Sequence, residues 1–212
     1  VFEEVQNQGF KMTDEGSMEA YLGLRIDRSK GDEFSISQPF LVDRIIDAIP
    51  GMNDAKISKI PAATDQILTK DIDGPLRKDN WHYRSVIGML NYLVNCSQPD
   101  LAYAVHQCAR FCADPRHSHE QAVKKIVRYL KYLRQAGQLG ICYKPDKFKS
   151  LENYVDASFA GEWNKSWSTE PSSVMSRTGY VILYANCLII WSSKLQTEIA
   201  LSTTESAYIA LS

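Results

Sequence analysis

The spacing of apolar residues changes twice along the chain, which indicates strands towards both ends and helices in the middle. Bulky apolar residues alternate with polar ones over residues 20–27, residues 29–32 supply turn chemistry, and residues 33–37 alternate again. This pattern predicts a β-hairpin. From Pro39 the apolar residues recur every three or four positions and Gly51 follows the last of them, so we predict a helix that ends there.

Helical spacing returns after residues 53–79, a stretch rich in Pro, Asp, Lys and Thr that has little periodicity and is the best linker candidate. Three helices are expected beyond it. The first covers about 80–95 and the second begins at Ser97. The third opens with Ser118 and Gln121, whose spacing is that of a capping box.

Beyond Gly137 the alternation typical of strands returns. Four strands and a last helix near Ser202 are expected, with the strands at 139–143, 151–158, 178–184 and 187–193. Helices and strands that occur in separate runs predict a mixed α+β fold.

Composition places the chain among ordinary globular proteins. Its 212 residues are 44% hydrophobic and 23% charged, and 24 basic against 25 acidic residues leave a net charge of -1. No apolar run reaches the roughly 20 residues that cross a bilayer, so no membrane partner is expected. We expect an intracellular protein, in the cytoplasm or the nucleus. The charge balance neither favours nor excludes a nucleic-acid partner.

The five cysteines do not follow the spacing of a disulfide framework or a standard zinc site, because their number is odd and no CxxC occurs. Cys108 and Cys112 have three histidines nearby in the sequence, and a metal cluster is one interpretation. The favoured alternative places both thiols on the buried stripe of a helix, where free Cys acts as a small hydrophobe.

Two carboxylates are candidates for metal chemistry: Asp156 on a predicted strand, and Glu205 in the first turn of the last predicted helix. An acid on a strand that faces an acid on an adjacent helix forms half of a divalent-cation site, because hard cations take oxygen ligands. Structural alternatives stay open. Ser202 and Glu205 also have capping-box spacing, and Asp156 is compatible with a turn at the strand end.

Basic side chains gather on the helix expected over residues 118–135, where Glu120 is the only acid. The helical spacing of Lys124, Arg128, Lys131 and Arg134 predicts a ridge that projects outward, opposite the apolar stripe, and follows a phosphate backbone. A merely solvated face is the alternative. The candidate nucleic-acid-binding residues are Lys124, Lys125, Arg128, Lys131 and Arg134.

Short motifs follow one another along nearly the whole chain. They are YLGLRI (21–26), ISQPFL (36–41), YRSVIGMLNYL (83–93), QPDLAYAV (98–105), AVKKIVRYLK (122–131), YVDASFAG (154–161), RTGYV (177–181), IWSSKLQ (190–196) and ALSTTESAY (200–208). In this order they resemble the copia-type LTR retrotransposon polyprotein, in the region that joins its reverse transcriptase to its ribonuclease H.

The resemblance implies three segments. Residues 1–65 would be the end of the reverse transcriptase palm and a thumb-like segment, residues 66–148 a helical connection, and residues 149–212 a partial ribonuclease H-like domain. The implied fold is a β-hairpin with a helical thumb and connection, followed by a truncated ribonuclease H-like mixed sheet with a helix.

The same resemblance assigns roles to individual residues. Asp156 and Glu205 would be the first two acidic ligands of a two-Mg²⁺ site that hydrolyses the RNA strand of an RNA/DNA hybrid. Tyr21, Leu22 and Gly23 would help to position the primer terminus.

Two parts of the family pattern are missing. The palm aspartates are expected before Val1 and the later ribonuclease H acids beyond Ser212, so we expect the chain alone to lack polymerase activity and to have little or no nuclease activity. The loop over residues 161–176 is longer than is usual in the family. The leading hypothesis is a fragment of a reverse transcriptase and ribonuclease H, whose partners are an RNA/DNA hybrid or duplex and the rest of the polyprotein. The alternatives are a non-catalytic nucleic-acid-binding module and an expressed pseudogene product.

Overall fold

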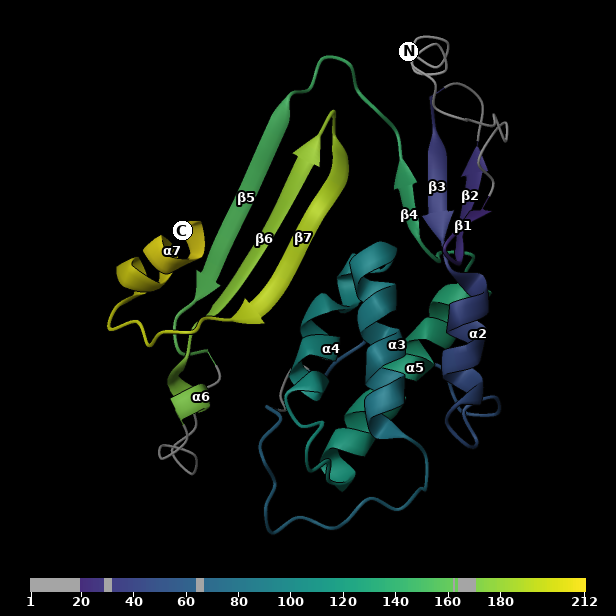
Figure 1. Ribbon diagram of the computed structural model, residues 1–212, viewed down its shortest axis with the longest axis vertical. Coiled ribbons are helices and arrows are strands. Elements are labelled where there is room, and N and C mark those ends of the chain that lie inside the picture. The colour runs from purple at the N-terminus through teal and green to yellow at the C-terminus, as the bar shows by residue number, and fades with distance from the viewer. Residues whose placement is uncertain (1–19, 29–31, 64–66, 162, 164–170) are drawn as a thin grey trace, which may run out of the picture.

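The computed structural model describes residues 20–28, 32–63, 67–161, 163 and 171–212. Within these residues the chain forms two antiparallel sheets and a set of packed helices (Figure 1). The expected mixed α+β class is therefore confirmed. The three segment boundaries implied by the family resemblance stay predictions.

The first sheet has the strand order β1-β2-β3-β4, with β1 (Ala20–Tyr21), β2 (Leu24–Arg28), β3 (Phe34–Ser37) and β4 (Ile141–Tyr143). The antiparallel pairing of β2 with β3 confirms the expected hairpin, although residues 29–31 of its turn lie outside the described residues. The pairing of β3 with β4 joins two segments far apart in the sequence, and alternation alone did not predict it.

The strand expected over residues 20–27 is interrupted at Leu22 and Gly23. Both residues have positive φ angles, 49° and 80°, and they form the two-residue turn between β1 and β2. Gly suits such a turn because it has no Cβ to clash in the left-handed region. The expectation of one continuous strand was therefore wrong, because alternation on either side of a tight turn resembles a single run.

The helices form the second part of the fold. They are α2 (Pro39–Asp47), α3 (Tyr83–Cys96), the short 3-10 helix η1 (Pro99–Leu101), α4 (Ala102–Ala109) and α5 (His117–Gln135). Each helix expected over this range is found, and the one expected from Ser97 is divided into η1 and α4. We call these packed helices the helical body.

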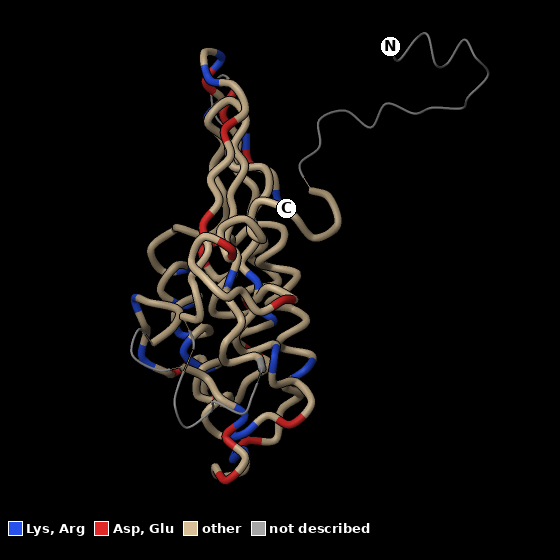
Figure 2. The backbone as a smooth tube through the Cα atoms, turned by 90° about the vertical axis from the view of Figure 1, so that its left-hand side faces the viewer, with Lys and Arg blue, Asp and Glu red and all other residues tan. Residues whose placement is uncertain are grey.

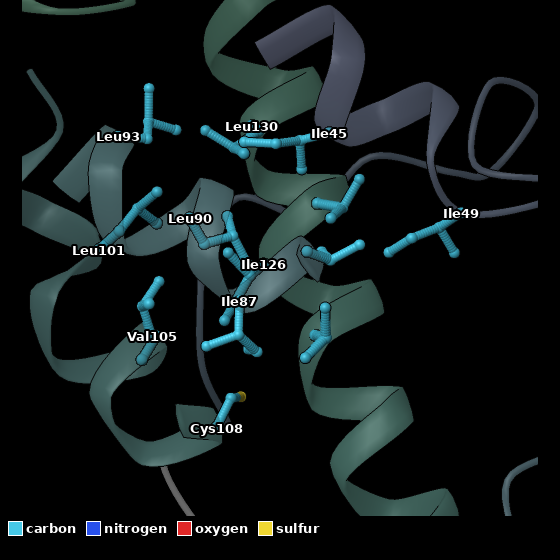
Figure 3. Close-up of a cluster of buried hydrophobic side chains, with 14 of the residues drawn as sticks. Ile45, Ile49, Ile87, Leu90, Leu93, Leu101, Val105, Cys108, Ile126 and Leu130 are labelled. Atoms are coloured by element: carbon cyan, nitrogen blue, oxygen red, sulfur yellow. The ribbon is translucent and has the colours of Figure 1, made fainter. Parts of the chain in front are cut away.

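The core of the helical body is built from the apolar stripes of its helices (Figure 3). Several branched side chains have no more than 1% of their surface exposed: Ile45, Leu90, Leu93, Leu101, Ile126 and Leu130. Leu90 and Leu93 are three residues apart in α3, and Ile126 and Leu130 are four apart in α5, so that each of these helices turns one apolar face inward. Full burial of such a side chain stabilises the fold by about 1.5 to 3 kcal/mol.

The N-terminus of α5 differs from the sequence prediction. The backbone N–H of Arg116 donates to His119 Nδ1 at 2.8 Å, and the helix begins at His117 rather than at the expected capping box of Ser118 and Gln121. The Ser118 hydroxyl instead donates to Asp71 at 2.6 Å. A polar residue at capping-box spacing therefore ties a distant loop to the helix here.

The stretch expected to be a linker is held against α5 by a buried carboxylate. Glu120 is fully buried and accepts hydrogen bonds from the backbone N–H of Lys78 (3.0 Å) and from Trp81 Nε1 (3.2 Å). Lys124 Nζ lies 3.1 Å from the same carboxylate. Burial alone would raise the pKa of Glu120, but these hydrogen bonds outweigh it and lower the pKa to about 2.

The second sheet contains β5 (Leu151–Ser158), β6 (Arg177–Tyr184) and β7 (Cys187–Leu195) in that order, and all three strands were expected. Together with the helix α7 (Thr203–Leu211) we call it the sheet unit. In the loop that precedes β6, residues 162 and 164–170 lie outside the described residues, and the described part includes the short helix α6 (Pro171–Val174).

Specific contacts join the sheet unit to the helical body. Arg177 Nη1 donates to His106 Nδ1 at 3.0 Å, and its guanidinium lies over the ring of Tyr103 at 5.0 Å. Trp191 Nε1 donates to the carbonyl oxygen of Val94 at 2.9 Å. In the part of the chain that the structure describes, no helix is long and apolar enough to cross a membrane. Basic and acidic residues are interspersed along the molecule (Figure 2).

Candidate functional site

Asp156 lies near the end of β5, directly opposite Gly179 of β6. Its side chain is exposed, and Oδ1 accepts a hydrogen bond from the backbone N–H of Ala157 at 2.9 Å. A shallow depression surrounds it, lined also by Tyr154 and Val181. The depression exists because Gly179 has no side chain, and a Cβ there would meet no atom closer than 4.0 Å.

Glu205 lies in the first turn of α7, where it takes part in the cap of that helix. The Ser202 hydroxyl accepts from the backbone N–H of Glu205 at 3.1 Å. Glu205 Oε2 in turn accepts from the backbone N–H of Leu201 at 2.6 Å. The Ser202 half of the capping box that the sequence left open is therefore confirmed, while the Glu205 carboxylate bonds one residue before the N-cap, at Leu201. These contacts account for a Glu at this position without a metal.

The elements that carry the two carboxylates are neighbours, since α7 packs beside β5 (Figure 1). Strand register nevertheless separates the faces involved. Asp156 shares a sheet face with Arg177, which points to the helical body. Thr178 lies on the opposite face of the sheet, where the Gln196 amide donates to its hydroxyl. The same amide donates to the Ser206 carbonyl oxygen, so α7 is tied to the face opposite Asp156.

This arrangement differs from the expected one, in which Asp156 and Glu205 meet across a cleft. Each carboxylate bonds to the backbone of its own segment. Among the described residues, no group of three or more His, Cys, Asp or Glu side chains is placed to hold a metal ion. The assignment of both residues as metal ligands stays a prediction.

The hairpin tip proposed to contact a primer is exposed. Tyr21 and Leu22 have 55% and 70% of their surface exposed. The Tyr92 hydroxyl of α3 donates to the Leu22 carbonyl oxygen at 2.7 Å, which fixes the tip against the helical body. The role of Tyr21, Leu22 and Gly23 in primer positioning stays a prediction.

Lys124 of α5 is engaged in ion pairs rather than directed to solvent. Its Nζ lies 2.5 Å from Asp79 and 3.1 Å from Glu120, and only 15% of its side chain is exposed. Burial opposes the charged form, but the hydrogen bonds to Asp79 and Glu120 outweigh it and raise the pKa of Lys124. These contacts account for Lys124 structurally.

Lys131 is buried, with 4% of its surface exposed, so the expectation that it projects outward was wrong. Its Nζ donates to the backbone carbonyl oxygens of Met52 (2.8 Å), Asn53 (2.7 Å) and Ala55 (2.6 Å). The three donors of an ammonium group thus match three carbonyls that follow α2. Helical spacing cannot reveal such a partner, because it comes from a segment far away in the sequence.

The remaining basic residues of α5 differ in their contacts. Arg134 forms an ion pair with Asp43 of α2. Lys125 and Arg128 are half-buried and line the same cavity, and neither side chain has an ion-pair or hydrogen-bond partner among the described residues. Among the five candidate nucleic-acid-binding residues, these two are therefore the cations best placed to meet a phosphate.

The cysteine cluster considered from the sequence is resolved in favour of packing. Cys108 is 1% exposed, and burial raises the pKa of its thiol to about 12. The Tyr83 hydroxyl donates to the carbonyl oxygen of Cys108 at 2.9 Å. A protonated thiol inside a hydrophobic core is a poor metal ligand, since metals bind the thiolate.

Comparison with known proteins gives two relatives that match over 96% of this chain. The retrovirus-related Pol polyprotein from transposon TNT 1-94 of Nicotiana tabacum is 32% identical over 212 residues. The transposon Ty5-1 protein of Saccharomyces cerevisiae is 30% identical over 206 residues. The chain spans only 15% of the tobacco polyprotein and 62% of the yeast protein.

A further relative is described as an effector protein rather than as a transposon protein. The secreted RxLR effector protein 161 of Plasmopara viticola is 35% identical over 133 residues, which make up 63% of this chain and 86% of that protein. No family model and no solved structure matches the chain. The matches over nearly all of this chain agree with the order of its motifs. The chain belongs to the retrovirus-related Pol polyproteins of copia-type transposons.

Proposed function

We propose that this chain is the region of a transposon polyprotein that connects reverse transcriptase to ribonuclease H, and that it holds nucleic acid there without catalysis of its own. One observation carries this proposal. A helical body with a well-buried core joins a three-stranded sheet with two acids on β5, of which Glu152 forms an ion pair with Lys149 and Asp156 alone has no ion pair among the described residues. Because a two-metal nuclease site requires several shared carboxylates, a sheet of this kind favours a supporting segment over an enzyme that works alone.

Magnesium is the cofactor that the family resemblance implies, and the donor set tests whether it fits. Mg²⁺ requires near-octahedral oxygen coordination, and a two-metal site requires several shared carboxylates. The described residues offer Asp156 and Glu205, on different elements and each bonded to its own backbone segment. This set does not fit Mg²⁺ as arranged, so we derive no catalytic step from it.

The test is direct. The purified chain is incubated with Mg²⁺ and a labelled RNA/DNA hybrid, and separately with a primed template and deoxynucleotides. We expect neither hydrolysis nor extension above background. Hydrolysis by the wild-type chain that disappears in Asp156→Asn would overturn the proposal, because it would show that this carboxylate belongs to a working site.

The nucleic-acid contact in this proposal is assigned to Lys125 and Arg128. Both lie on the same face of α5, three residues apart, and neither is neutralised by an acid in the described residues. Cations without an acidic partner bind phosphates through counterion release, which is independent of base sequence and sensitive to salt. This observation also supports the second candidate function, a non-catalytic nucleic-acid-binding module.

A further inference from the structure

A partly enclosed cavity of about 200 Å³ lies in the helical body between α4, α5 and the described residues 61–63 and 68. Its apolar part is formed by Leu68, Ala104, Cys108 and Ile126. Cys108 and Ile126 belong to the core cluster (Figure 3), so the cavity opens directly onto the hydrophobic core. It lies apart from Asp156, which is on the sheet unit.

The polar side of this cavity is positively charged. Lys125 and Arg128 both line it. Arg128 Nε is buried and has no hydrogen-bond partner. A buried donor without a partner costs about 1 to 3 kcal/mol, so an acceptor brought by a ligand would be stabilising here. An anion at this side of the cavity supplies such an acceptor.

The remaining lining residues suit a flat polar ring. Tyr103 lines the cavity, and the Arg177 guanidinium lies over one face of its ring, 5.0 Å from the ring centre. Gln107 and Gln121 also line the cavity. The Gln107 amide donates to the Tyr103 hydroxyl at 3.2 Å and accepts from Arg110 at 2.8 Å, so Gln121 is left to bring an amide oxygen to the cavity. Amide groups pair with the donors and acceptors at the edge of a heterocycle, and an aromatic face stacks on its plane.

We propose that this cavity binds one unpaired nucleotide, with the base against the apolar side and Tyr103 and the phosphate on Lys125 and Arg128. The inference rests on the proposed nucleic-acid contact and adds a base-dependent site to it. A duplex would use only the two cations, since its bases are stacked and paired. An acidic peptide also matches the charge, but the aromatic ring of Tyr103 and the Gln121 amide favour a nucleotide.

The experiment compares two labelled single strands on the full chain, by fluorescence anisotropy. One is a short oligothymidine and the other is the same strand with alternate thymines replaced by abasic sugars. We expect the intact strand to bind at least about fivefold more tightly, because base stacking on an aromatic side chain contributes substantially to affinity. Thymidine monophosphate as a competitor distinguishes a free nucleotide from one within a strand as the source of the ligand.

Matched variants separate the parts of the site. Lys125→Ala combined with Arg128→Ala should weaken the binding of both strands, by about tenfold at low salt. Ala122→Phe, which places a ring into the cavity from α5, should remove the difference between intact and abasic strands. Lys147→Ala is the control, because this side chain is 83% exposed and lies outside the cavity. Thermal unfolding of each variant shows whether it is folded.

Each outcome decides something. Equal affinity of the wild-type chain for intact and abasic strands overturns the base site, while the proposed phosphate contact stands. An absence of binding to any strand overturns both. A Glu- and Tyr-containing peptide that binds more tightly than the intact strand, and loses binding in Ala122→Phe, would assign the cavity to a peptide. The wild-type comparison needs no variant, so a misfolded Ala122→Phe leaves the test intact.

Discussion

The helical body and the sheet unit differ in how they use apolar residues. The helical body encloses its large aliphatic side chains almost completely. In the sheet unit, several large apolar side chains are more than half exposed: Leu151, Tyr154, Tyr184, Leu201 and Tyr208. Burial of apolar surface is the main stabilising contribution to folding. The comparison teaches that the stability of this molecule resides in the helical body, whereas the carboxylates singled out from the sequence lie on the less buried part.

The largest effect is expected from a core substitution in the helical body. Leu90→Ala removes a fully buried side chain and should lower the free energy of unfolding by about 3 to 5 kcal/mol, through lost transfer energy and a residual cavity. Urea denaturation followed by circular dichroism measures this change. The matched substitution in the sheet unit is Leu151→Ala, at a side chain that is 63% exposed, and it should cost less than about 1 kcal/mol. Equal costs at both sites would remove the contrast between the two parts.

Acid should weaken the helical body next. The pKa of Glu120 is lowered from its ordinary 4.5 to about 2, so its contribution is present at neutral pH and is lost as the pH falls from about 4.5 towards 2. The loss should reach about 3 kcal/mol. Burial also lowers the pKa of His119, whose stabilising neutral form begins to be lost below its ordinary value of 6.5. Urea midpoints measured over this pH range should fall in both windows.

Glu120→Gln separates the two acid-sensitive groups. This variant should be less stable at neutral pH, and its stability should fall much less than that of the wild-type chain below about pH 4.5. The fall in stability below pH 6.5 that is assigned to His119 should persist. An unchanged acid profile would show that Glu120 is not the group responsible.

A smaller effect is expected at Lys131. Lys131→Met keeps the aliphatic stem but leaves three carbonyl oxygens without their donor, which should cost about 2 to 3 kcal/mol. Arg134→Ala is the control on the same helix: its ion pair with Asp43 joins two exposed side chains and is expected to contribute no more than about 1 kcal/mol. Similar thermal unfolding of the two variants would contradict the buried role of Lys131.

The smallest effect on stability, and a clear one on binding, is expected when the two cations without partners are removed. Lys125→Ala combined with Arg128→Ala should flatten the logarithmic salt dependence of RNA/DNA hybrid binding by about 1 to 2 units. Thermal stability should not fall and should rise slightly, because neither side chain loses a partner among the described residues and the buried, unpaired Arg128 Nε is removed. A salt slope equal to that of the wild-type chain would mean that this face of α5 is merely solvated.

Much of the fold could be predicted from local periodicity. The strand over 151–158 and the long helix that ends at Gln135 follow directly from the spacing of apolar residues. The turn at Leu22 and Gly23 could not be recognised, since alternation continues on both sides of it. The pairing of β3 with β4 was equally hidden, because cross-strand partners far apart in sequence leave no local signal.

The candidate site was less predictable, for a physical reason. The spacing of basic residues on α5 indicates which side chains share a face, but it does not show which of them meet an acid or a carbonyl from elsewhere. Glu120 and Lys124, four residues apart, could have been recognised as an ion pair from helical geometry. The partners Asp79 and Met52 come from distant segments, and only the tertiary fold reveals them.

The pairing of β3 with β4 has a consequence for the order of folding. Phe34–Ser37 precedes the first helix of the body and Ile141–Tyr143 follows the last, so this short ladder closes a loop that contains every helix of the body. Bringing together the ends of so long a loop carries a large entropic cost unless the intervening chain has already condensed. We therefore expect the β3–β4 ladder to form after the helices have packed, as the last step in the folding of the helical body.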